Sequence, residues 1–146
     1  MPKTFNEFEV GEKFVSPAIT VTDAHITLFA GLSGDFNPLH VNDEFAKKTP
    51  FGARIAHGLL TITLMSGFMG MLVAGTAIAF LEARYKFLAP VKVGDTIHTE
   101  GEVVEKKPTS KYPGGVVRFK YEIKNQRGEV CVEGEAALLV ADRVLY

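Results

Sequence analysis

The chain has 146 residues, of which 47% are apolar and 23% are charged, and its formal net charge is −1. This composition excludes an intrinsically disordered chain, and the length predicts a single domain over residues 1–146. The balance of 16 basic against 17 acidic residues argues against a nucleic-acid-binding surface, and the single cysteine predicts a reducing, cytoplasmic location.

The first part of the chain predicts a strand followed by short helices. Residues 14–21 are expected to form the strand. Thr22 is a good N-cap for a helix that ends at Gly31 or Gly34, because glycine commonly terminates helices. A second, shorter helix is expected over residues 43–48.

From Ile55 to Leu81 the chain has 27 residues without Asp, Glu, Lys or Arg. Such a length is typical of a transmembrane helix. However, Gly75 and Thr76 form a natural break, which leaves a helix over residues 58–74. That helix would span roughly 26 Å, short of a comfortable membrane crossing. We therefore expect no membrane span, and interpret the segment as a buried helix packed against a sheet.

The second half of the chain predicts four long strands of an antiparallel sheet. Residues 117–124 alternate apolar with charged side chains, which is typical of a strand with one solvated face. The turn sequence at 125–128 leads into a partner strand over 130–140. Residues 77–88 and 95–105 are expected to form the other two strands.

Asp35 and His40 carry residue types that are suited to acid–base chemistry. They lie five positions apart, on a segment whose turn residues Asn37 and Pro38 predict a loop between two helices. On such a loop the carboxylate and the imidazole can converge on one water molecule. The spacing also allows a structural role, in which Asp35 makes an Asx turn and His40 packs beneath it.

Gly58 opens the expected buried helix. The first N–H groups of a helix lack intrahelical partners and carry the positive end of the helix dipole. Because glycine has no Cβ, a ligand oxygen could approach this N–H directly and be stabilised there as it gains negative charge. The alternative is a glycine that is needed only where the chain enters a crowded helix.

Asp35, His40 and His57 also raise the possibility of a metal site with two histidines and one carboxylate. Their spacing matches no strong metal-binding motif. We therefore expect no metal and no cofactor.

Several segments resemble the MaoC-like, (R)-specific enoyl-CoA hydratases. The sequence SGDFNPLH at 33–40 resembles the signature of this family. IAHGLL at 55–60, FLAPVKVGD at 87–95 and FEVG at 8–11 are also similar to family segments. The resemblance covers essentially the whole chain. It implies the hotdog fold of the α+β class, a long antiparallel sheet wrapped around a central helix, and a homodimer.

The resemblance implies that Asp35, His40 and Gly58 are the catalytic residues. Asp35 and His40 would act through a bound water, and the Gly58 N–H would bind the thioester oxygen. The residues expected to contact the substrate are Asn37, His57 and Ser66. The implied reaction is the reversible hydration of a trans-2-enoyl-CoA to the (R)-3-hydroxyacyl-CoA.

Two other functions stay open. Hotdog domains also support acyl-CoA thioesterases, which attack the carbonyl carbon of the thioester. Because a fold does not establish activity, a non-catalytic acyl-CoA-binding subunit is the third hypothesis. The presence of both Asp35 and His40 favours hydration over these two. In each case the expected partner is an acyl-CoA, and neither a nucleic acid nor a membrane.

Overall fold

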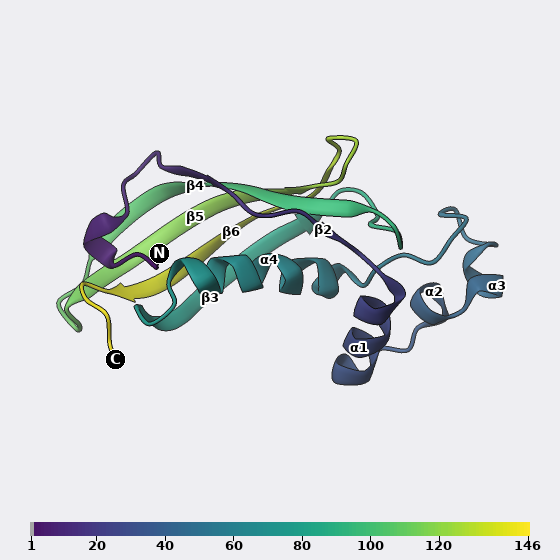
Figure 1. Ribbon diagram of the computed structural model, residues 1–146, viewed down its shortest axis with the longest axis horizontal. Helices are drawn as coiled ribbons and strands as arrows, with labels where there is room; N and C mark the ends of the chain where they lie inside the picture. Colours follow the sequence, from purple (N-terminus) through teal and green to yellow (C-terminus); the bar gives the residue numbers. More distant parts are fainter. Residues whose placement is uncertain (1) are drawn as a thin grey trace.

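A curved antiparallel sheet lies along one long helix in the computed structural model, which describes residues 2–146 (Figure 1). The strands are β1 (Lys13–Val15), β2 (Ile19–Thr20), β3 (Ala77–Phe87), β4 (Thr96–Pro108), β5 (Gly114–Lys124) and β6 (Val130–Ala141). The helices are the 3-10 turn η1 (Phe5–Glu7), α1 (Asp23–Ser33), α2 (Pro38–Val41), α3 (Asp43–Ala46) and α4 (Gly58–Leu72).

The four long strands expected from the sequence are confirmed, and they run in the order β4-β5-β6-β3. Every pairing is antiparallel, and β1 and β2 both pair with the outer side of β4. The prediction of one strand over 14–21 is wrong. Pro17 has no N–H to donate, and the Ser16 hydroxyl accepts a hydrogen bond from the Thr99 N–H at 2.8 Å. The segment is therefore divided into β1 and β2.

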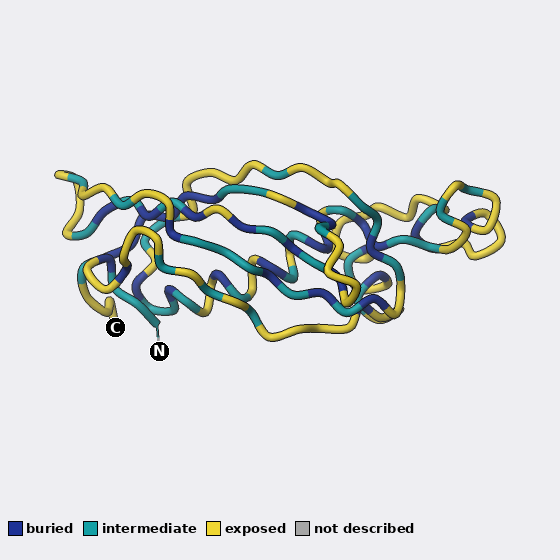
Figure 2. Tube along the Cα trace, turned by 90° about the horizontal axis from the view of Figure 1, so that it is seen from above, coloured by how far each residue is buried: buried dark blue, intermediate teal, exposed yellow. Residues whose placement is uncertain are grey.

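Helix α4 supplies the centre of the core. Its buried apolar side chains, Leu60, Met65 and Met69, belong to one hydrophobic cluster with the inner residues of the sheet. Figure 2 shows buried positions recurring along this helix and along the strands that face it. The helix ends at Leu72 and β3 begins at Ala77, so the uncharged segment contains a helix and a strand, as predicted. Within residues 2–146, no helix is both long and apolar enough to cross a membrane.

A row of five residues crosses the sheet and alternates aromatic rings with glycines. The strand register aligns Phe14 with Gly101, Gly101 with Tyr121, Tyr121 with Gly134, and Gly134 with Tyr85. A Cβ on Gly101 would lie 2.1 Å from the Phe14 ring, and one on Gly134 would lie 2.7 Å from the Tyr121 ring. The Phe14 and Tyr121 rings thus fill the space above neighbouring glycines, and this packing lets the sheet curve closely around α4.

Helices α1, α2 and α3 project beyond the end of the sheet (Figure 1). Arg54 holds these three helices together. Its Nε donates to Asp43 Oδ1 and its Nη2 donates to Asp23 Oδ1, both at 2.6 Å, and its Nη1 donates to the His40 carbonyl at 3.4 Å. The two carboxylates raise the pKa of the Arg54 guanidinium. One side chain therefore connects all three helices to the segment that precedes α4.

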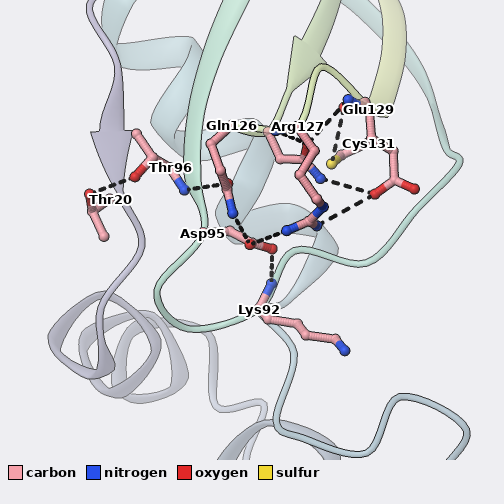
Figure 3. Close-up of polar contacts among 9 residues, drawn as sticks. Thr20, Lys92, Asp95, Thr96, Gln126, Arg127, Glu129 and Cys131 are labelled. Atoms are coloured by element: carbon pink, nitrogen blue, oxygen red, sulfur yellow. Dashed lines mark hydrogen bonds and ion pairs between the residues drawn. The ribbon is translucent and has the colours of Figure 1, made fainter.

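Asp95 anchors the turn between β3 and β4 to the turn between β5 and β6 (Figure 3). Its carboxylate accepts hydrogen bonds from the Lys92 N–H and the Gln126 amide, both at 2.9 Å, and from Arg127 at 3.3 Å. Burial alone would raise the pKa of Asp95, but these donors outweigh burial and hold its pKa below the ordinary value. The network therefore stabilises the folded chain through the ionised carboxylate.

Asp95→Asn is expected to lower the free energy of unfolding by about 1–3 kcal/mol at pH 7. Because the folded-state pKa lies below the unfolded-state pKa, this contribution is present above the unfolded-state value and is lost as the pH falls through the folded-state value. The stability gap between wild type and variant should therefore close in acid. Urea unfolding at pH 7 and at about pH 3 measures it. Glu44→Gln, at an exposed position, is the control. A stability difference between wild type and Asp95→Asn that stays constant with pH would contradict the role of the ionised Asp95 carboxylate.

Candidate active site

Asp35 lies just after α1, in a loop held by local hydrogen bonds. Helix α1 ends at Ser33 and is capped by Gly34, whose φ of 78° is left-handed and favours glycine. The Ser33 hydroxyl accepts from the Asp35 N–H, and Asp35 Oδ1 accepts from the Asn37 N–H, both at 3.1 Å. Asp35 therefore does make the Asx turn considered from the sequence. This turn uses only Oδ1, and leaves Oδ2 free to take part in chemistry.

His40 is placed by the short helix α2, where the sequence predicted only a loop. Pro38 occupies the first turn of α2, and the Asn37 side chain caps it by accepting from the Leu39 N–H at 3.0 Å. The one turn of helix directs the buried His40 ring to the Ile55 carbonyl, 2.8 Å from Nδ1. Asn37, expected to contact substrate, thus uses its side-chain oxygen to build the helix that carries His40.

Asp35 Oδ2 and His40 Nε2 face each other across 3.9 Å. Because a carbonyl oxygen can only accept, the hydrogen bond to Ile55 requires the proton on Nδ1 of the neutral His40 ring and leaves a lone pair on Nε2. Two acceptors then face each other at a distance too long for a direct hydrogen bond. A water molecule that donates one hydrogen to each of them satisfies both.

His57 contacts both members of this pair. Its Nε2 donates to the Asp35 carbonyl at 3.0 Å, and its ring stacks on the His40 ring with centroids 3.9 Å apart and planes at 26°. Phe29 of α1 packs on it with a centroid distance of 4.9 Å. The sequence predicted that His57 contacts substrate, but the structure places it behind the pair with 2% of its surface exposed.

His40 and Gly58 line the same cavity, which has a volume of about 520 Å³. The other lining residues are mostly apolar: Phe51, Ile55, Ala56, Leu59, Thr61, Phe87, Leu88, Ala89, Pro90, Val91 and Val132. Within the described chain no side chain caps the start of α4. Phe87 packs against Gly58 so closely that a Cβ there would lie 2.8 Å from the ring.

Ser66 is not brought to the Asp35–His40 pair within one chain. It lies eight residues beyond Gly58 on α4, or roughly 12 Å along the helix axis. Its hydroxyl donates to the Thr63 carbonyl at 2.8 Å. Ser66 lines a separate cavity of about 280 Å³ between α4 and β3.

Asp35, His40 and His57 offer potential ligand atoms within 4.8 Å of one another. Their orientation suits hydrogen bonding better than metal binding. The two rings are stacked, so the in-plane lone pairs of their nitrogens do not converge on one ion. In addition, one nitrogen of each ring is engaged by a backbone carbonyl.

Sequence reasoning missed two groups that shape the site. The Ile55 carbonyl fixes the tautomer of His40, but a backbone acceptor leaves no signal in a sequence. Phe87 is the first residue of the FLAPVKVGD segment, but the resemblance implies no role for it at the site. Its contact with Gly58 depends on how β3 ends beside α4, and this is a tertiary property.

Comparisons with known proteins identify the family of the chain. Residues 5–124 match the MaoC like domain. The chain is 37% identical over 139 residues to the (R)-specific enoyl-CoA hydratase of Rhodospirillum rubrum, covering 95% of this chain and 92% of that protein. The corresponding Aeromonas caviae enzyme is 37% identical over 118 residues, covering 79% of this chain and 83% of that protein.

The structure of the R-hydratase PhaJ1 from Pseudomonas aeruginosa superposes with a TM-score of 0.85 at 34% identity, covering 96% of this chain and 86% of that one. This likeness confirms the expected hotdog fold, in which the sheet wraps around α4. The chain belongs to the MaoC-like dehydratase family.

Proposed function

We propose that the protein catalyses the reversible hydration of a trans-2-enoyl-CoA to the (R)-3-hydroxyacyl-CoA. The observation that carries the proposal is the pair of acceptors, Asp35 Oδ2 and His40 Nε2, which face each other across 3.9 Å near the start of α4. Relatives that are named (R)-specific enoyl-CoA hydratase or 3-hydroxybutyryl-CoA dehydratase support it.

In the proposed reaction, Asp35 and His40 hold one water through both of its hydrogens, so that an oxygen lone pair is free to attack C3 of the enoyl group. The attack forms the C3–O bond and moves negative charge onto the thioester oxygen. The Gly58 N–H at the start of α4 stabilises this charge. One proton of the water passes to the dyad and is returned to C2, which completes the addition. Dehydration follows the same steps in reverse.

The apolar cavity supports a fatty acyl substrate. Leu59, Leu88 and Val91 are among its walls, and its volume of about 520 Å³ is in the range of small-molecule sites. An apolar wall also lowers the local dielectric constant, which strengthens the interaction between the Gly58 N–H and the enolate-like oxygen.

Crotonyl-CoA tests the proposal directly. Hydration removes the absorbance of the enoyl thioester without releasing free CoA, and this is the expected result. Release of free CoA, measured with a thiol reagent, would instead show a thioesterase. If neither change occurs while the chain binds crotonyl-CoA, the protein is an acyl-CoA-binding subunit and the proposal is wrong.

Gly58→Pro is expected to lower kcat about 100- to 1,000-fold relative to Gly58→Ala. Both variants place a Cβ against Phe87, but only proline removes the N–H. Proline is well tolerated in the first turn of a helix, so the comparison isolates the donor. Steady-state kinetics with crotonyl-CoA measure the ratio. Equal kcat values for the two variants would exclude the Gly58 N–H as the oxyanion donor.

We also propose that the protein is a homodimer that pairs through β3. This strand forms one edge of the sheet over 11 residues and exposes Phe80 and Leu81, and such an edge readily pairs with another chain. Sedimentation equilibrium should give the mass of two chains of 15.9 kDa. Leu81→Lys should shift the mass toward one chain, and a wild-type chain that sediments as a monomer would contradict the proposal.

A further inference from the structure

We infer that His57 is a positioning residue that fixes Asp35 and His40 relative to each other, an inference that rests on the proposed hydratase function. The ring makes one contact to each of them: a hydrogen bond of 3.0 Å from Nε2 to the Asp35 carbonyl, and a stack of 3.9 Å on the His40 ring. With 2% of its surface exposed and no place in the lining of the cavity, it acts through its neighbours.

The chemistry of the ring supports this role. A carbonyl oxygen must accept, so the proton of the neutral His57 ring lies on Nε2 and its Nδ1 carries a lone pair. Nδ1 is buried and has no hydrogen-bond partner among residues 2–146. A buried acceptor without a partner destabilises the fold. A phenylalanine would fill the same space between Phe29 and His40 without this buried lone pair, but it could not donate to the Asp35 carbonyl. The hydrogen bond to the site is therefore what the histidine contributes.

The placement of His57 in the chain links it to the whole site. The Ile55 carbonyl holds the His40 ring, the His57 side chain holds the Asp35 backbone, and the next residue, Gly58, begins α4. The segment before α4 therefore sets the 3.9 Å gap between Asp35 and His40 and the position of this gap relative to the helix start. Because a displacement of about 1 Å can cost 100-fold in rate, this alignment has a measurable effect.

Two substitutions separate the two contacts of the ring. His57→Phe keeps an aromatic ring to stack on His40 but removes the donor to the Asp35 carbonyl. His57→Gln loses the stack but carries an N–H donor at nearly the same distance from the backbone as Nε2. His98→Phe is the matched control, because His98 lies on β4 and pairs with Glu100. It should leave activity unchanged.

We expect His57→Phe to lower kcat for crotonyl-CoA hydration about 10- to 100-fold. Calorimetric binding of butyryl-CoA, a saturated analogue, should change less than about twofold. The Tm should change little, because the removal of the buried lone pair offsets the lost hydrogen bond to Asp35. His57→Gln should recover part of the lost kcat. Unchanged kcat in His57→Phe would overturn the inference. So would weakened butyryl-CoA binding with normal kcat, the result expected of a substrate-binding residue.

A second readout does not depend on activity. The backbone carbonyl carbon resonance of Asp35 should shift in His57→Phe, because the variant removes its hydrogen-bond donor, and should partly return in His57→Gln. The imidazole nitrogen resonances of His40 should report the proton on Nδ1 in all three proteins, because the Ile55 carbonyl is unchanged. If the wild type does not hydrate crotonyl-CoA, the proposed function fails, while the Asp35 resonance still tests the positioning role. An Asp35 carbonyl resonance that is identical in the wild type and in His57→Phe would overturn the inference.

Discussion

Asp35→Asn is expected to lower kcat for the hydration of crotonyl-CoA by about 100- to 10,000-fold, and His40→Ala should have an effect of the same order. Asparagine can keep the hydrogen bond from the Asn37 N–H, because its side-chain oxygen replaces Oδ1. It then presents an NH₂ group where Oδ2 faces His40, so the attacking water loses one of its two acceptors. Alanine at position 40 removes the other acceptor and the ring that stacks on His57.

The two residues should act as one unit, so that the double variant loses little more activity than the worse single variant. Steady-state kinetics measure all three variants, and circular dichroism checks that each is folded. Glu44→Gln, an exposed carboxylate that is paired with Lys47, is the matched control and should keep normal kcat. A folded Asp35→Asn or His40→Ala variant with more than a tenth of wild-type kcat would contradict the dyad mechanism.

Phe119→Ala is expected to lower the free energy of unfolding by about 3–5 kcal/mol. Phe119 lies at the middle of β5 with 0% of its surface exposed. Its ring packs edge-on against Phe8 at 5.5 Å and against Phe14 at 5.8 Å, which ties the N-terminal segment to the sheet. Truncation therefore leaves a cavity between the N-terminal segment and the sheet.

Urea unfolding at neutral pH measures this loss as a shift in midpoint. Tyr112→Ala is the control, because Tyr112 is 50% exposed in the loop between β4 and β5 and should change stability by less than about 0.5 kcal/mol. A loss below 1 kcal/mol for Phe119→Ala would show that the core can close around the missing ring.

The long elements were predictable because their signals are local. The alternation in β5 and the uncharged, glycine-bounded segment of α4 follow directly from side-chain period and burial. The segment over 14–21 was not predictable to the same degree. Whether it pairs as one strand depends on Ser16 meeting the Thr99 N–H, and these two residues lie 83 positions apart. The short helix α2 was hidden by Asn37 and Pro38, which signal a loop and a helix start equally well.

The approach of Asp35 to His40 was predictable from the sequence, whereas the geometry around them was not. The spacing of Asp35 and His40 suggested that they converge, and the structure brings Oδ2 to 3.9 Å from Nε2. The position of His57 behind them depends on how the segment before α4 folds back onto α1, and no local pattern specifies this. Ser66 illustrates the reverse: the resemblance suggested a place near the site, whereas the helix carries it to another cavity within the chain.

The row of alternating rings and glycines across the sheet also bears on how the strands find their correct partners. A shift of one residue between β-strands turns every side chain to the wrong face, but a shift of two keeps the faces and is harder to reject. Here a two-residue slip of β5 against β4 would place Tyr121 beside Thr99 or Val103 in place of Gly101. The Tyr121 ring would then overlap the side chain of Thr99 or Val103, and where β6 keeps its place the space above Gly134 would be left empty. The row thus discriminates against misaligned sheets during folding.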